Sequence, residues 1–132
     1  MKKFAVLTFL VVLVTVKTEL TVEQREKLTN MANRCTKETG ATEEMVQKSM
    51  NGEFSEDPRF KEFLFCVDKQ AGFVDESGKR NRDALKMQLV ETFGHEDKID
   101  NILDTCLAIE KPTPQETAFE LAKCFYKELE MA

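Results

Sequence analysis

The sequence has no tryptophan and only one histidine, His95, among 132 residues. Catalysis needs a nucleophile, a base and an orienting group, or a paired acid and base in a cleft. One histidine with scattered serines and threonines offers neither arrangement at a recognisable spacing. The sequence therefore does not indicate an enzyme. His95 is better explained as a solvated loop residue than as a pH-sensitive gate.

A basic stripe is missing as well. The chain has 19 basic and 24 acidic residues, and no segment concentrates Lys and Arg without interleaved Glu and Asp. Nucleic-acid binding needs such a stripe to displace the counterions of the phosphates. No cysteine pair has the short spacing of a zinc site. We therefore expect no nucleic-acid partner, no metal and no cofactor, and an acidic surface that serves solubility.

The first segment has the layout of a secretory signal peptide. Two lysines precede an apolar stretch over residues 4–14, which is too short to span a bilayer as a stable anchor. We expect cleavage after Thr18, to within a few residues, so that residues 1–18 form the leader and residues 19–132 one secreted domain. Without the leader, 16 basic residues face 24 acidic ones, and the formal charge becomes −8.

Four cysteines are spread through the mature region. Intervals of 30, 39 and 17 residues separate Cys35, Cys66, Cys106 and Cys124. An even number of cysteines in a small exported chain indicates disulfides, because free thiols do not persist in an oxidising compartment. We expect two bridges, and the spacing alone leaves all three pairings open.

Apolar residues recur at helical spacing along the whole domain. No stretch alternates with period two, and there is no internal repeat or low-complexity linker. Start and stop signals divide the domain into six short helices. We expect them from Thr21 to Gly40, from Thr42 to Asn51, from Asp57 to Gly72, from Asn81 to Gly94, from just after Gly94 to Lys111 and Pro112, and from Thr113 to about Leu129.

Two of these helix starts carry several signals each. Asp57 can accept hydrogen bonds from free amides of the first turn, while Pro58 loses nothing at the first helical position. At the sixth helix, Thr113, Pro114 and Glu116 combine a cap, a first-turn proline and a carboxylate that can reciprocate the cap.

The stretch DPRFKEFLFCVDKQAGFVDESG, residues 57–78, is similar to the central part of insect odorant-binding proteins. In that family an aromatic-rich helix around the third cysteine ends in a glycine and a Phe-Val/Ile-Asp turn. The cysteine positions extend the resemblance over the whole mature chain. The family usually has six cysteines, and Glu62 and Gln115 stand here at the second and fifth. Those two cysteines would bond each other, so their joint absence resembles the four-cysteine Minus-C branch.

The resemblance implies an all-α fold, with about six short helices around an internal apolar cavity. It implies the disulfides Cys35–Cys66 and Cys106–Cys124, each worth roughly 3 to 4 kcal/mol by chain entropy. Candidate wall residues come from the apolar helix faces, and ordinary core packing is the alternative for each of them. These candidates are Leu28, Phe54, Phe60, Leu64, Phe73, Leu85, Leu89, Leu103, Leu107, Ala118, Ala122 and Phe125.

From the resemblance we expect a secreted carrier, a monomer or weak dimer, that binds odorants, pheromones or similar small apolar ligands. Its surroundings would be sensillar lymph, haemolymph or a gland secretion, and a chemosensory receptor is a candidate partner. A non-sensory lipid carrier in haemolymph or reproductive glands fits the same residues. A cytokine-like module acting through its charged surface is the alternative from another class. A saposin-like membrane-active protein fits less well, because the charge of −8 opposes binding to anionic lipid.

Overall fold

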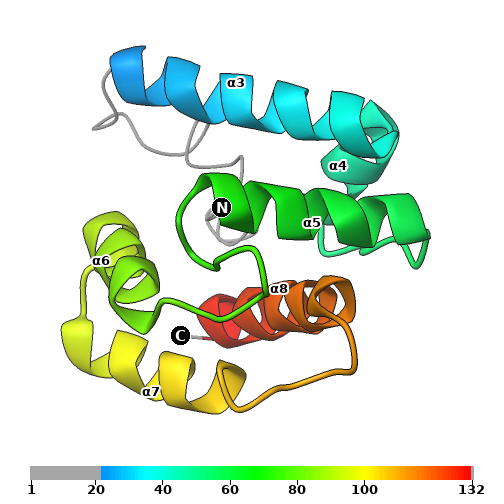
Figure 1. The fold of residues 1–132 in the computed structure, drawn as a ribbon. Coiled ribbons are helices and arrows are strands. Elements are labelled where there is room, and N and C mark those ends of the chain that lie inside the picture. The colour runs from blue at the N-terminus through cyan, green and yellow to red at the C-terminus, as the bar shows by residue number, and fades with distance from the viewer. Residues whose placement is uncertain (1–21, 132) are drawn as a thin grey trace.

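The computed structural model describes residues 22–131, so the leader, its cleavage site and Thr21 lie outside the described residues. The described part forms six α-helices (Figure 1), namely α3 Val22–Thr39, α4 Glu43–Ser49, α5 Pro58–Gln70, α6 Arg82–Phe93, α7 Glu96–Cys106 and α8 Pro114–Met131. Within it, the only β-type pairing is an isolated bridge between Val74 and Arg80. The prediction of an all-helical fold with six short helices is confirmed.

The central helix of the fold is α5. It packs against α3 on one side and α8 on the other, while α7 contacts both α6 and α8 (Figure 1). Apolar side chains from all six helices join in a single buried cluster. Because α5 is covered on two sides, its apolar residues extend around more than half of the helix. The sequence pattern predicted such a buried helix at this position.

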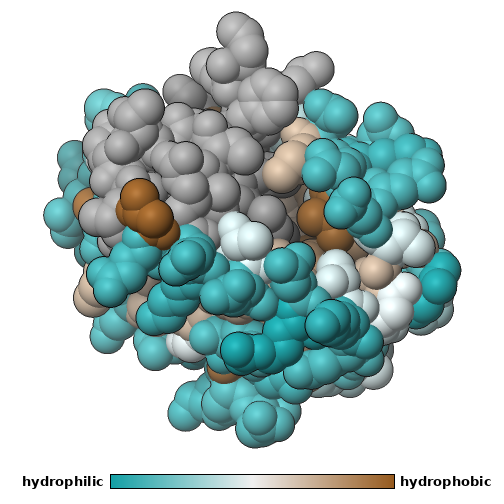
Figure 2. Space-filling model, turned by 90° about the horizontal axis from the view of Figure 1, so that it is seen from above, coloured by the Kyte–Doolittle hydropathy of each residue, from teal (hydrophilic) through white to brown (hydrophobic). Residues whose placement is uncertain are grey.

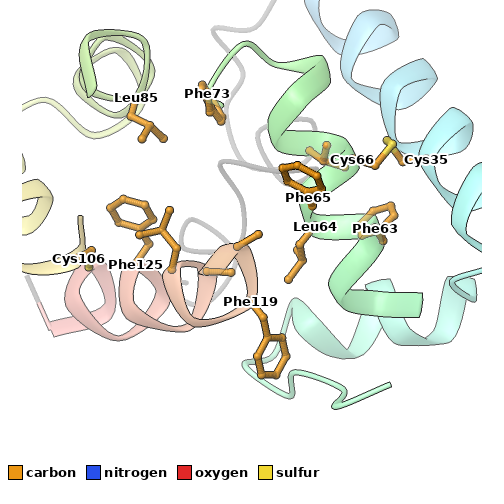
Figure 3. Close-up of a cluster of buried hydrophobic side chains, with 14 of the residues drawn as sticks. Cys35, Phe63, Leu64, Phe65, Cys66, Phe73, Leu85, Cys106, Phe119 and Phe125 are labelled. Atoms are coloured by element: carbon orange, nitrogen blue, oxygen red, sulfur yellow. A yellow bond between two sulfur atoms is a disulfide. The ribbon is translucent and has the colours of Figure 1, made fainter. Parts of the chain in front are cut away.

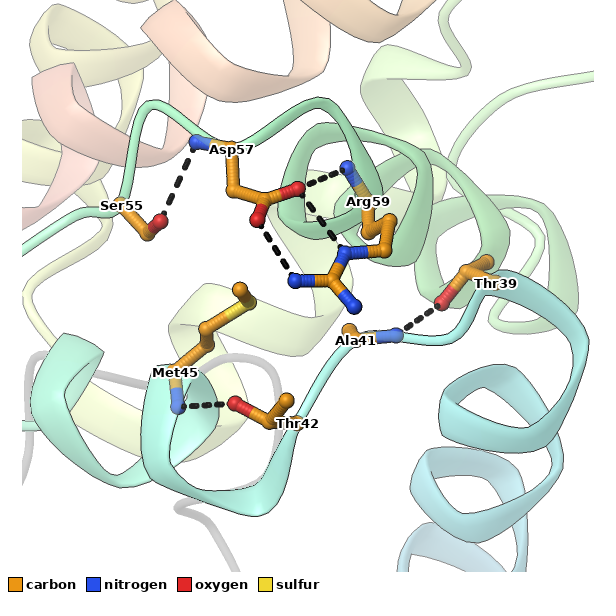
Figure 4. Close-up of polar contacts among 7 residues, drawn as sticks. All are labelled: Thr39, Ala41, Thr42, Met45, Ser55, Asp57 and Arg59. Carbon is orange, nitrogen blue, oxygen red and sulfur yellow. Dashed lines mark hydrogen bonds and ion pairs between the residues drawn. The ribbon is translucent and has the colours of Figure 1, made fainter.

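Side-chain caps begin α4 and α5 where the sequence predicts them (Figure 4). The Thr42 hydroxyl accepts a hydrogen bond from the backbone N–H of Met45 at 3.1 Å. The Asp57 carboxylate accepts one from the backbone N–H of Arg59 at 2.8 Å and another from its guanidinium, also at 2.8 Å. The side-chain hydrogen bond from Arg59, helped by the backbone one, lowers the pKa of Asp57 to about 2. These caps satisfy amides that the first turn leaves free.

The start of α8 is only partly as predicted. The Thr113 hydroxyl accepts from the backbone N–H of Glu116 at 3.1 Å, as a cap should. The Glu116 carboxylate, however, lies 2.9 Å from the ammonium of Lys61 on α5. The reciprocal half of the predicted capping box is thus replaced by an ion pair between helices, because α5 presents a cation next to the first turn of α8.

The fifth helix ends earlier than predicted. The sequence places its end at Lys111 and Pro112, but α7 ends at Cys106, with Leu107 as its C-cap. A turn follows, in which the N–H of Ile109 donates to the carbonyl of Cys106 at 3.1 Å. Arg80, from the loop before α6, donates to the carbonyl of Ile109. The segment after Cys106 is thus held by a turn and by a hydrogen bond from another part of the chain, where the sequence pattern predicted continued helix.

Two disulfides tie the helices together. Cys35–Cys66 joins α3 to α5 and Cys106–Cys124 joins α7 to α8, with sequence separations of 31 and 18 residues. They are the same pairs as those that the resemblance implies. Neither bridge includes α6, which is held by packing and by ion pairs to α7 such as Lys86–Asp100 at 3.1 Å.

Candidate functional site

The inner face of α8 is apolar and contains small residues. Ala118, Ala122 and Phe125 are spaced four and three residues apart, which places them on one face of the helix. Their exposed fractions are 5%, 6% and 0%. Figure 3 shows Phe125 pointing toward Leu85 of α6, while Phe119 points away to the other side of α8. The helix therefore has two apolar faces with different neighbours.

Eight of the candidate wall residues are buried on helix faces or turns that point into the core. Leu64 of α5, Phe73 of the loop after it, Leu85 of α6 and Phe125 of α8 can be followed in Figure 3. All eight belong to the single hydrophobic cluster of the fold. We call this set the inner cluster, and its members are Leu64, Phe73, Leu85, Leu89, Leu103, Ala118, Ala122 and Phe125.

Two other candidates, Phe54 and Phe60, lie in an aromatic group at another part of the same core. The ring of Phe54 meets Tyr126 edge-on with 5.7 Å between centroids, and it lies 6.5 Å from both Phe119 and Phe60. Phe60 also stacks on Phe63 at 5.9 Å. Edge-to-face and offset contacts of this kind stabilise aromatic packing. Through these contacts the α4–α5 loop packs against α5 and α8. The contacts involve Phe119 and Tyr126, which do not lie on the inner face of α8.

The last two candidates, Leu28 and Leu107, are only half-buried and pack against the margin of the core. Sequence reasoning also left out several fully buried side chains, such as Phe63, Ile99 and Phe119. Ile99 follows the same helical period as the chosen residues, so periodicity marked it as buried. The apolar period of a helix predicts which of its residues are buried, but it does not predict which face of a neighbouring helix they contact.

Sequence reasoning missed Asp68, the one ionisable side chain that is buried among the described residues, with 5% exposed. It follows Leu64 by four residues on α5, so both project from the same side of the helix. No hydrogen bond or ion pair links its carboxyl group to another described residue. Burial raises the pKa of Asp68 to about 8, so the neutral acid predominates at neutral pH. The available signal was an acidic residue one turn after Leu64, directly following the apolar run from Phe63 to Val67.

Ser49, the other buried polar residue of the described part, has a partner. Its hydroxyl donates to the carbonyl of Val46 at 2.6 Å, so its burial is compensated within α4. Asp68 is thus the one buried ionisable residue of the described part that has no partner there, while on the half-buried Glu130 a single carboxylate oxygen is also buried without a hydrogen bond.

Glu62 and Gln115 contact each other across α5 and α8. The Gln115 amide donates to the two Glu62 carboxylate oxygens at 3.0 and 3.3 Å. These are the positions at which six-cysteine relatives would carry their second and fifth cysteines. A charge-assisted hydrogen bond therefore stands where those proteins have a covalent bridge. The contact adds a polar link between α5 and α8 to their apolar packing in the core.

The surface contrasts with the interior. In Figure 2 the described residues are mostly hydrophilic, with hydrophobic ones in small patches. A surface groove next to the loop of Ser77 to Arg80 is lined by charged side chains, among them Lys79, Glu110 and Lys111. His95 is exposed between α6 and α7. In residues 22–131, no helix has both the length and the apolar character that crossing a membrane requires.

Comparison with known proteins agrees with this architecture. Residues 17–128 match the PBP/GOBP family. The B1 protein of Tenebrio molitor is 33% identical over 122 residues, covering 92% of each chain. General odorant-binding protein 19d of Drosophila melanogaster is 32% identical over 110 residues, covering 80% of this chain and 73% of its own.

A solved structure shares the fold. It is a fatty-acid-binding protein, OBP56a, from the oral disk of the blowfly Phormia regina, with a TM-score of 0.71 and 27% identity, covering 88% of this chain and all of its own. The two disulfides and the polar contact at positions 62 and 115 agree with the four-cysteine branch. The chain therefore belongs to the PBP/GOBP family, the pheromone-binding and general odorant-binding proteins of insects.

Proposed function

We propose that this protein is a secreted carrier that binds small hydrophobic molecules in its helical interior and delivers them through an extracellular fluid. The observation that carries the proposal is the inner cluster, where apolar faces of four helices converge under a mostly hydrophilic surface. Two residues on the inner face of α8, Ala118 and Ala122, are small and buried, and larger side chains there would occupy more of the interior. The leader, residues 1–18, is removed on export, and residues 19–132 form the single working domain.

The relatives support the class of ligand. The blowfly protein is named for binding fatty acids, and the Drosophila protein for binding odorants. A ligand with about ten buried methylene groups at ~0.8 kcal/mol each gains ~8 kcal/mol, of which association consumes at least ~4. Moderate affinity follows, and it suits a carrier that must release its cargo. The inner cluster offers no nucleophile with a base and orienting group, so we propose transport without catalysis.

The test is displacement of a fluorescent apolar probe, N-phenylnaphthylamine, from the purified, oxidised protein by long-chain alcohols, esters, fatty acids and terpenoids. We expect saturable probe binding that these ligands compete away. Ala122→Leu places about three carbon atoms in the inner cluster and should weaken probe binding by ~2 kcal/mol, about thirtyfold.

Ala108→Leu is the matched control, because Ala108 is exposed and the same change there should leave probe binding unaltered. Circular dichroism verifies that both variants are folded. A folded wild-type protein that takes up no probe would contradict the carrier proposal and would direct attention to the charged surface of an interaction module.

A further inference from the structure

The side chain of Asp68 sits in an unusual position for an acid. It is 95% buried, on the side of α5 that also carries Leu64. Its own backbone carbonyl accepts a hydrogen bond from the N–H of Phe73 at 2.9 Å, which brings it next to another member of the inner cluster. The carboxyl group therefore projects among the residues that we propose to contact ligand.

No residue of the described part offers this carboxyl group a charged partner. The helices packed against α5 are α3 and α8. Their buried side chains in the described part are apolar, namely Met31 and Cys35 from α3 and Ala118, Phe119, Leu121, Ala122, Phe125 and Leu129 from α8. On the same side of α5, two turns earlier, the ammonium of Lys61 is occupied by Glu116 at 2.9 Å and Glu56 at 3.4 Å.

Leaving a buried polar group unpaired lowers the stability of a folded protein, because the group loses its hydrogen bonds to water and gains none in exchange. If this position served only to fill an apolar interior, an apolar residue such as Leu or Met would be expected there. An acid that has no partner among the described residues and faces an apolar binding region is explained by a partner that arrives with the ligand.

We propose that Asp68 is the polar anchor of the interior, where its carboxyl group hydrogen-bonds the oxygen atom of a neutral long-chain ligand such as an alcohol, aldehyde or ester. This inference rests on the proposed carrier function and refines it by naming the ligand class. A neutral carboxyl group both donates and accepts hydrogen bonds, so it serves a hydroxyl as well as a carbonyl oxygen. The raised pKa of Asp68, about 8, keeps the donor proton in place at neutral pH.

The experiment compares three ligands of one chain length, dodecane, dodecanol and dodecyl acetate, as competitors of N-phenylnaphthylamine at neutral pH. Asp68→Leu replaces the hydrogen-bonding group by a larger apolar side chain. It should weaken dodecanol and dodecyl acetate about tenfold, the usual value of one buried hydrogen bond, and leave dodecane within about twofold. Asp68→Asn keeps a donor and an acceptor, and it should retain the preference for the two oxygen-bearing ligands.

Asp68→Ala serves as the second variant if Asp68→Leu does not fold, with the same expected change in the ratio of dodecanol to dodecane affinity. Equal losses for all three ligands in the Leu or Ala variant, or no loss for any of them, would overturn the anchor while leaving the carrier function intact. If the wild-type protein binds none of the three ligands and no probe, the carrier function fails and the anchor fails with it.

Discussion

Replacing Asp68 by Asn should remove a pH dependence from the stability of the protein. The folded state holds the carboxyl proton up to pH about 8, whereas the unfolded chain releases it near pH 3.8. Between these values the unfolded state binds fewer protons, so raising the pH lowers the free energy of unfolding. Stability from this group is fully present below the lower value and is lost as the pH rises through the upper one. The slope is ~1.4 kcal/mol per pH unit.

The assay is urea unfolding, followed by circular dichroism, of the wild-type protein and Asp68→Asn at a series of pH values between 3.8 and about 8. The difference in free energy of unfolding should grow by ~1.4 kcal/mol per pH unit in favour of the variant. Other groups cancel in this difference, including Asp57, whose pKa of about 2 produces loss of stability only in acid. Parallel pH profiles would mean that Asp68 is ionised and hydrated in the folded protein, and would refute the burial argument.

Three further predictions concern stability, measured by urea unfolding. Replacing both cysteines of one bridge by Ser should cost ~4 kcal/mol for Cys35–Cys66 and ~3 kcal/mol for Cys106–Cys124, because the first closes the longer loop; the reverse order would contradict the chain-entropy argument. Gly52→Ala should cost clearly more than Gly72→Ala, since both glycines have positive φ but only at Gly52 would a Cβ lie 2.7 Å from the Tyr126 ring; equal costs would show that the ring moves aside freely. A double-mutant cycle of Glu62→Ala and Gln115→Ala should give a coupling of about 1 kcal/mol for their hydrogen bond, and additive effects would mean that the contact contributes nothing.

Helix starts were predictable because a cap is a local interaction. The side chain at Thr42, Asp57 or Asn81 reaches an amide only two or three residues further on, so sequence neighbours contain all the necessary information. The end of α7 was not predictable in this way. The apolar period continues past Cys106, but the chain turns there, and Arg80 from the loop before α6 donates to the carbonyl of Ile109; no local pattern reports that contact.

The candidate site was predictable as a set of buried apolar residues, but its internal division was not. The sequence placed Phe54 and Phe60 together with Ala118 and Phe125, because all four follow apolar patterns. In the folded chain, Phe54 and Phe60 pack with Phe119 on another face of α8. Which apolar faces meet depends on how the helices cross, and the period of a single helix carries no information on its neighbours.

By itself, the sequence determined the helical class, the number of helices and most of their starts, since these follow from the 3.6-residue period and from local capping. Only the tertiary structure decided that Glu62 and Gln115 would meet across two helices and that α7 would end at Cys106. It also decided that Asp68 would be buried, with no partner among the described residues. The physical reason is that burial and pairing are properties of the packed helices together, and each helix alone leaves all of its faces open to water.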